Sequence, residues 1–284
     1  MQPRAGAKQV ISIYVEGTGL LAPGLDGWAA SRPYLLGERP YTSKPPQLPP
    51  SPLLPPNERR RMVTTVKLAL LVGAEAFAQA RRDPSATASV FTSSGGDGET
   101  IHNILESLAA AEIDVSPTRF HNSVHNAPSG YWAIATRSRA PTTSLCAHDA
   151  SFATGLIDAA AQATADFEAV ALMAYDLPYP EPLNERRTIG TAFAVAMVLS
   201  PKPTAAAFAR LTLDLIRSDR PASTMADPAL EAMRVGNPAA RSLPLLAALA
   251  GPNAAELVID SASGSKLAIT VTPEPSGFAH DYRA

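Results

Sequence analysis

Residues 142–155, TTSLCAHDASFATG, are the most informative stretch of the chain, because they place its only cysteine just before a helix of small residues. The alanine-rich residues 150–165 predict that helix. Small side chains allow other backbones to approach closely, so we expect this helix at the centre of the fold. His148 and Asp149 follow Cys146 directly, but adjacent helical residues do not face each other, which argues against a catalytic triad. Asp149 or Ser151 is more simply a helix cap, and Cys146 is more simply a small buried side chain.

Strands and helices alternate on both sides of this stretch, which predicts an α/β fold. The expected strands are residues 9–15, 86–93, 168–176 and 191–200, the expected helices are 58–81, 99–112, 150–165 and 241–250, and 256–273 form a hairpin with Gly264 in the turn. Residues 205–216 fit either a strand or a helix. Residues 117–141 and the loop that contains Pro221 and Pro228 are expected to be irregular. The apolar strand at 168–176 ends in a polar residue, as central parallel strands do.

A proline-rich arm occupies residues 33–56. Proline fixes φ and removes a backbone donor, so the whole of residues 20–56 is expected to be loop. The arm also carries several leucines, and it is too apolar for a free linker. We therefore expect it to lie across a surface, either its own or that of a partner.

The composition excludes several classes of function. The net charge is −2, which gives no electrostatic basis for binding nucleic acid. A single cysteine excludes an internal disulfide and gives no reason to assign an oxidising compartment. No apolar run approaches the roughly 20 residues of a membrane span, and the N-terminal run VISIYV is too short for a signal peptide. We expect a soluble cytoplasmic protein.

Several segments, in this order and spacing, resemble the N-terminal half of a β-ketoacyl synthase. They are EGTGLLAPG (16–24), SSGGDGET (93–100), FHNSVHNAPSGYWAIA (120–135), AVALMAYD (169–176) and TAFAVAMVLS (191–200). The resemblance implies a thiolase-like α/β fold with a mixed, mainly parallel sheet covered by helices. It assigns residues 1–216 to the ketosynthase-like domain. Residues 217–284 then form an extension whose short helix and β-hairpin pack on the same domain.

The same resemblance indicates a degenerate nucleophile. In this family a catalytic Cys lies between a Thr-Ala pair and Ala-Ser, before a helix of small residues. If this chain is aligned with the family pattern at Gly155, the position of the nucleophile falls on Ala147, and Cys146 lies one residue before it. One residue is about 100° of rotation on a helix. We therefore expect no catalytic residue, and Cys146 and His148 remain the alternative candidates.

The family's two catalytic histidines are also missing. A complete ketosynthase supplies them from its second half, in HGTGT-type and GHTxGA-type motifs, and neither string occurs here. Residues 217–284 are too few to build that half, and their only histidine is His280. The resemblance thus implies a chain that is truncated relative to an active ketosynthase.

Large side chains around the FHNSVHNAPSGYW block are expected at the acyl pocket or a subunit contact, where amphipathic aromatics concentrate. They are Phe120, His121, His125, Tyr131, Trp132 and Phe152. His121 and His125 have the i, i+4 spacing of a zinc pair, but Pro117 and Pro128 flank them and no HExxH pattern is present. SGGDG lacks the ending of a phosphate-binding loop, and GxGxxG is absent. No metal and no cofactor are expected.

The function that the resemblance implies is that of a non-catalytic, chain-length-factor-like subunit in aryl polyene-type biosynthesis. Its partner would be a full-length β-ketoacyl-acyl-carrier-protein synthase in a heterodimer, with transient contact to an acyl carrier protein and self-pairing when alone. Two alternatives stay open. The chain is an acyltransferase or thioesterase-like enzyme that uses Cys146, or it is a stand-alone module that binds an acyl group or the carrier protein.

Overall fold

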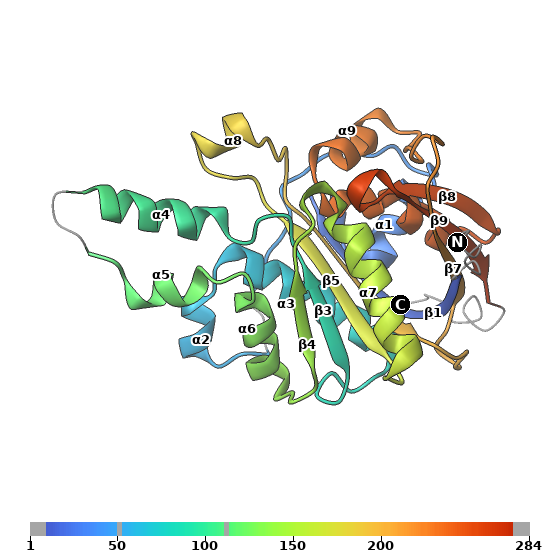
Figure 1. The fold of residues 1–284 in the computed structure, drawn as a ribbon, viewed down its shortest axis with the longest axis horizontal. Coiled ribbons are helices and arrows are strands. Elements are labelled where there is room, and N and C mark those ends of the chain that lie inside the picture. Colours follow the sequence, from blue (N-terminus) through green and yellow to red (C-terminus); the bar gives the residue numbers. More distant parts are fainter. Residues whose placement is uncertain (1–9, 50–52, 111–113, 275–284) are drawn as a thin grey trace, which may run out of the picture.

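The computed structural model describes residues 10–49, 53–110 and 114–274 (Figure 1). Its centre is a nine-stranded sheet of order β4-β3-β5-β6-β1-β7-β9-β8, with β2 paired to β1. The strands are β1 Ile11–Ala22, β2 Leu25–Asp26, β3 Ala88–Thr92, β4 Thr142–Leu145, β5 Val170–Asp176, β6 Phe193–Ser200, β7 Ala209–Ile216, β8 Ala255–Asp260 and β9 Lys266–Pro273.

Helices cover both faces of this sheet, which confirms the predicted α/β class. They are α1 Trp28–Leu35, α2 Pro56–Arg61, α3 Thr64–Ala80, α4 Gly98–Ala109, α5 Pro117–Asn122, α6 Ala127–Thr136, α7 Ser151–Ala165, α8 Leu183–Arg186, α9 Pro228–Gly236 and α10 Leu243–Ala250, with the 3-10 turns η1 His148–Ala150, η2 Ala239–Ser242 and η3 Ala262–Gly264. In the described part of the chain, no helix has the length and apolar character needed to cross a membrane.

The expectation of a mainly parallel sheet is wrong. Parallel pairing joins β4, β3 and β5 only, and the other described pairs are antiparallel. β6 is buried along its whole length although both of its neighbours are antiparallel. Its apolar sequence reflects helices on both faces of the sheet, a situation that is common in parallel sheets but does not require them.

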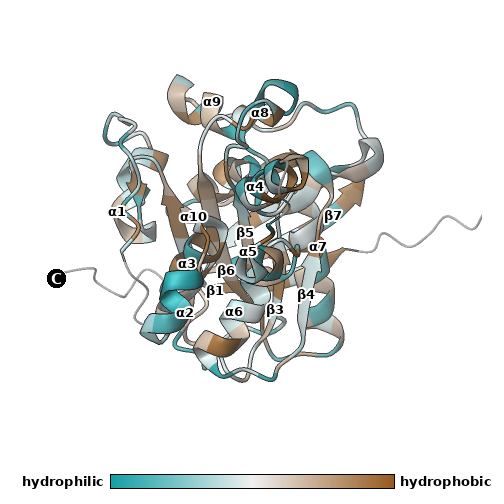
Figure 2. Ribbon diagram, turned by 90° about the vertical axis from the view of Figure 1, so that its left-hand side faces the viewer, coloured by the Kyte–Doolittle hydropathy of each residue, from teal (hydrophilic) through white to brown (hydrophobic). Residues whose placement is uncertain are grey.

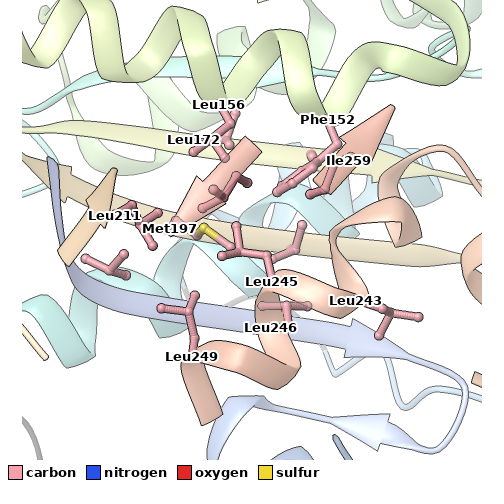
Figure 3. Close-up of a cluster of buried hydrophobic side chains, with 14 of the residues drawn as sticks. Phe152, Leu156, Leu172, Met197, Leu211, Leu243, Leu245, Leu246, Leu249 and Ile259 are labelled. Atoms are coloured by element: carbon pink, nitrogen blue, oxygen red, sulfur yellow. The ribbon is translucent and has the colours of Figure 1, made fainter. Parts of the chain in front are cut away.

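The small-residue helix α7 lies in the core, as its sequence predicts. It packs with α10 and η2 on one face of the sheet, around side chains that include Phe152, Leu156, Met197 and Leu246 (Figure 3). The predicted hairpin is present as β8 and β9, and β9 pairs with β7. The segment left open between strand and helix is the strand β7.

The opposite face is covered by α3, whose backbone approaches β1 very closely. A Cβ atom on Gly17 would lie 2.0 Å from the carbonyl oxygen of Ala76, and one on Gly19 would lie 2.0 Å from that of Val72. Glycine is therefore required at both positions. The predicted helix 58–81 is divided into α2 and α3 by extended backbone at Met62.

Four helices form in segments whose sequence predicts irregular structure. α1 lies in the expected loop 20–56 and contains Pro33. β1 also continues to Ala22. The expected irregular regions contain α5, α6 and α9. Proline occupies the first position of α5 and α9 and the second position of α6, where its missing N–H has no helical partner to lose. In these regions proline therefore starts helices.

Candidate functional site

Three parallel strands end at one edge of the sheet, and a short polar segment follows or ends each of them. The turn Ser93–Gly98 follows β3, the residues Cys146–Ala150 follow β4, and Asp176 is the last residue of β5. Ligands and reacting groups in open α/β sheets lie at the carboxyl ends of parallel strands. This edge is therefore the candidate site.

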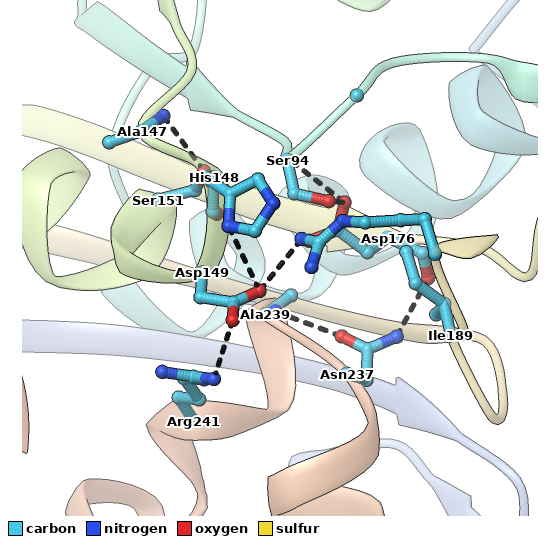
Figure 4. Close-up of polar contacts among 12 residues, drawn as sticks. Ser94, Ala147, His148, Asp149, Ser151, Asp176, Ile189, Asn237, Ala239 and Arg241 are labelled. Atoms are coloured by element: carbon cyan, nitrogen blue, oxygen red, sulfur yellow. Dashed lines mark hydrogen bonds and ion pairs between the residues drawn. The ribbon is translucent and has the colours of Figure 1, made fainter.

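Asp176 holds the turn after β3 in place through hydrogen bonds (Figure 4). Its Oδ1 atom accepts hydrogen bonds from the backbone N–H of Ser94 at 2.8 Å, from the Ser94 hydroxyl at 2.7 Å and from the Ser93 hydroxyl at 3.1 Å. Its Oδ2 atom is buried and has no hydrogen-bond partner among the described residues. Burial raises the pKa of Asp176 to about 6, and the bonds from Ser94 and Ser93 oppose that rise.

Tyr179 covers the same turn from the other side. A Cβ atom on Gly95 would lie 1.8 Å from the Tyr179 hydroxyl oxygen, and one on Gly98 would lie 2.2 Å from its ring. The two glycines are therefore required for the ring to rest on the turn. His125 borders the turn as well, with its Nε2 atom 3.2 Å from the carbonyl oxygen of Ser93.

Cys146 lies beside this turn with an exposed side chain. Its thiol donates to the carbonyl oxygen of Ser94, with 3.1 Å between sulfur and oxygen. None of the described hydrogen bonds joins this thiol to a histidine or a carboxylate.

A strained turn joins β4 to α7. His148 has a φ of +52°, in the left-handed region that non-glycine residues seldom adopt. A sharp strand-to-helix turn of this kind displays a nucleophile in other folds. Ser151 closes the turn, since its hydroxyl accepts from the N–H of Ala147 at 3.0 Å and donates to the carbonyl of His148 at 2.7 Å. The side chain at the left-handed position is an exposed imidazole.

Asp149 ties this turn to two other segments. Its carboxylate lies 2.7 Å from a guanidinium nitrogen of Arg187 and 3.0 Å from one of Arg241, and the Nδ1 atom of His148 lies at 3.5 Å. Burial alone would raise the pKa of Asp149, but the hydrogen bond from Arg187 and the charge of Arg241 bring it below the usual value. Asp149 thus faces two arginines and not the thiol of Cys146.

The predicted pocket or interface residues separate into two groups. Tyr131, Trp132 and Phe152 are buried in the core of the single chain, so their side chains are not available to a partner. Trp132 is 1% exposed and packs on Phe77, with ring centroids 5.4 Å apart. A substitution there acts on the fold first. Phe120 is 67% exposed, and His121 and His125 also reach the surface.

Sequence reasoning missed the residues that organise the site. Asp176 and Ser94 hold the turn, and Arg187 and Arg241 hold Asp149. Only Asp176 carried a signal, as the polar end of an apolar strand. An open groove of about 1200 Å³ lies elsewhere, lined by residues that include Glu16, Arg82 and Phe208, and no predicted site residue borders it.

Comparisons with known proteins place this geometry in context. A family model described as "Beta-ketoacyl synthase, N-terminal domain" matches residues 35–255. One similar solved structure is a ketosynthase (ApeO) in complex with its chain length factor (ApeC) from Xenorhabdus doucetiae, with a TM-score of 0.70, 23% identity, and coverage of 92% of this chain and 99% of that chain.

Two further structures are similar to the chain. A type II polyketide acyl-carrier protein in complex with its ketosynthase (AntDE:AntF) gives a TM-score of 0.71 at 11% identity, with coverage of 93% of this chain and 99% of that one. The ketosynthase of module 1 of the bacillaene synthase from Bacillus amyloliquefaciens FZB42 gives 0.54 at 13% identity, and covers 74% of this chain but 47% of that one. No protein with a curated description matches the sequence.

Proposed function

This chain belongs to the β-ketoacyl synthase family, N-terminal domain, and on that premise we propose that it is a non-catalytic, chain-length-factor-like subunit that pairs with a full-length β-ketoacyl-acyl-carrier-protein synthase. The predicted family and its thiolase-like fold are thereby confirmed. The pair would act in polyene-type or fatty-acid-type biosynthesis, and an acyl carrier protein would contact it transiently.

The candidate site supports a non-catalytic role. Decarboxylative condensation needs a thiolate to carry the acyl chain and donors that stabilise the enolate and the oxyanion. Here the thiol of Cys146 donates to a backbone carbonyl, and the residue at the left-handed position of the turn is His148. The negative charge of Asp149 is balanced by ion pairs with Arg187 and Arg241. These groups hold one another in place and leave no thiol–base pair.

The observation that carries the proposal is a largely exposed helix on the outside of the molecule. α4 projects away from the sheet together with α5 (Figure 1), and Thr100 is its only buried residue. Ile101, Leu105 and Leu108 form an exposed apolar stripe along it. A 12-residue helix is marginal in water without tertiary packing, and an exposed apolar patch of this kind marks an interface.

Neighbouring elements extend the same surface. Phe120 and Val124 add exposed apolar side chains around α5, and Ile134 adds one on α6. Figure 2 looks at this side of the molecule, with α4 and α5 toward the viewer and α6 and β4 behind them. β4 ends the strand order and pairs with β3 alone among the described strands, so one of its edges is free to pair. We call this the contact surface.

Solved relatives support a ketosynthase as the partner. One similar structure is itself a ketosynthase in complex with a chain length factor, and another is a ketosynthase in complex with its carrier protein. The bacillaene ketosynthase is matched over 47% of its length. A partner that carries both halves of the fold would supply the nucleophile and the histidines that this sequence lacks.

The test is a charge placed on the contact surface. Leu105 is 58% exposed, so Leu105→Asp should leave the fold intact and remove pairing with a co-expressed full-length ketosynthase, because a carboxylate would have to be buried in an apolar contact. Leu215→Asp is the matched control, since Leu215 is 55% exposed but lies on β7. Affinity co-purification and light scattering measure pairing. Equal pairing by both variants would contradict the proposal.

One observation favours a second candidate, an acyltransferase or thioesterase-like enzyme. The thiol of Cys146 is exposed and lies just before η1 and α7. Such an enzyme would form an acyl adduct on Cys146 when it is incubated with an acyl thioester. Intact-protein mass spectrometry of the wild type and of Cys146→Ala distinguishes the two functions.

A further inference from the structure

The turn after β3 connects a buried carboxylate to an exposed thiol. Asp176 accepts three hydrogen bonds from Ser93 and Ser94, all on Oδ1. The carbonyl oxygen of Ser94 accepts the hydrogen bond of the Cys146 thiol. Any change that moves Ser94 relative to Asp176 therefore also changes the contact of Cys146.

Two side chains restrict how the turn can move. Tyr179 rests on Gly95 and Gly98, and His125 lies against the carbonyl of Ser93. The backbone N–H of Gly96 donates to the Ser93 hydroxyl at 2.9 Å, which ties the turn to itself. Asp176 is the carboxylate among these contacts, and His125 is a second titratable side chain.

Only a few segments of the chain place charged side chains near Asp176. Arg187, in the connection between β5 and β6, acts on it directly. Arg187 is shared with Asp149 before α7, which also faces Arg241 of η2 and His148 of η1. On its own strand, Asp176 is preceded by the buried phenol of Tyr175, which senses the charges of Asp176 and of Asp97 at the start of α4.

We propose that Asp176 is a positioning residue for Cys146: its carboxylate fixes Ser94, and the hydrogen bond to the Ser94 carbonyl keeps the Cys146 thiol weakly reactive. A carboxylate is a charge-assisted acceptor, and such hydrogen bonds are roughly twice as strong as neutral ones. When Asp176 takes up a proton, its three bonds weaken, the turn loosens, and the thiol loses its acceptor. With its pKa raised to about 6, Asp176 changes state between pH 5 and pH 7.

The consequence is that the Cys146 thiol reacts slowly at neutral pH. Beside the nucleophile of a ketosynthase partner, a reactive Cys146 would compete for acyl groups. This consequence rests on the proposed function, whereas the coupling from Asp176 to Cys146 concerns the chain alone and stands without a partner.

The experiment measures the alkylation of Cys146 by iodoacetamide from pH 5 to pH 9 in the full chain. Cys146 is the only cysteine, so the reaction reports a single site. The readout is the ratio of the second-order rate constants of Asp176→Asn and the wild type at each pH, which removes the rise in rate with pH that is common to both proteins. Asn mimics the protonated carboxyl group in shape and charge.

We expect a ratio of about tenfold above pH 7, the factor that corresponds to one hydrogen bond. It should fall to one at pH 5, with a midpoint near pH 6, because the wild-type carboxyl group is then protonated. Asp260→Asn is the control, since Asp260 pairs with Lys266 on the β8–β9 hairpin, and its ratio should stay at one. A ratio of one for Asp176→Asn at every pH, or a rise that is equal at every pH, would overturn the proposal.

A second measurement covers the case in which Asp176→Asn does not fold. In the wild-type chain, the amide nitrogen chemical shift of Ser94 should titrate with a midpoint near pH 6, because its N–H donates directly to Asp176. A Ser94 amide that does not respond between pH 5 and pH 7 would contradict the coupling.

Discussion

Burial of Asp176 disfavours its charged form, so the free energy of unfolding of the chain depends on pH. Its pKa is raised from 3.8 to about 6 in the folded chain. The folded state therefore binds the proton more tightly than the unfolded state, and the contribution to stability is present at low pH and lost as the pH rises through 6.

We predict that the free energy of unfolding of the wild type falls, relative to that of Asp176→Asn, by on the order of 1 kcal/mol between pH 5 and pH 7. The lowered pKa values of Glu16 and Asp149 place their effects below this window. Urea unfolding at pH 5, 6 and 7 measures the difference. Parallel stability curves for the two proteins would show that Asp176 is not the titrating group.

At the scale of elements, the packing of α3 on β1 depends on a glycine. We predict that Gly17→Ala lowers the free energy of unfolding by roughly 1–3 kcal/mol, because its Cβ would lie 2.0 Å from the carbonyl oxygen of Ala76 and the helix must move. Gly130→Ala in α6 is the control. A Cβ there meets nothing within 4 Å, and alanine should stabilise the helix by roughly 0.5–1 kcal/mol. Similar effects of both substitutions would contradict this packing.

The elements themselves were predictable where the pattern was strong. The apolar strands β5 and β6, the long helix α3 and the β8–β9 hairpin follow from periodicity and turn residues alone. The helices α5, α6 and α9 were missed because proline starts them as readily as it breaks them. The parallel or antiparallel direction of the strands was not predictable, because a strand that is covered by helices on both faces of the sheet is apolar in either case.

The site was less predictable than the elements, because its contacts join distant segments. Ser94 and Cys146 are 52 residues apart in sequence, and Asp149 and Arg187 are 38 apart. No local pattern specifies such neighbours. The sequence indicated a degenerate nucleophile near Cys146, but it could not indicate that the thiol faces a carbonyl or that His148 takes the left-handed position.

At the scale of the whole molecule, one side of the chain carries the unsatisfied features. The apolar stripe of α4, the exposed Phe120 and the free edge of β4 belong to the contact surface, whereas Cys146 and Asp176 lie in a polar network that is largely satisfied within the chain. This distribution supports the proposal of a subunit that assembles with a partner. The contact surface and the low reactivity of the Cys146 thiol are therefore two aspects of one proposed role.

The most direct test of this role is product formation from a malonyl donor by three preparations: the chain alone, the chain paired with a full-length ketosynthase, and the same pair with Cys146→Ala. We predict no condensation by the chain alone and no loss beyond about twofold on substitution in the pair, because the proposed function assigns the nucleophile and its histidines to the partner. Ala147→Cys should likewise leave the lone chain inactive, since removal of even one oxyanion donor costs about 10²–10³ in rate. Condensation by the chain alone, or loss of turnover by Cys146→Ala in a pair that stays assembled, would contradict the account and make Cys146 a nucleophile.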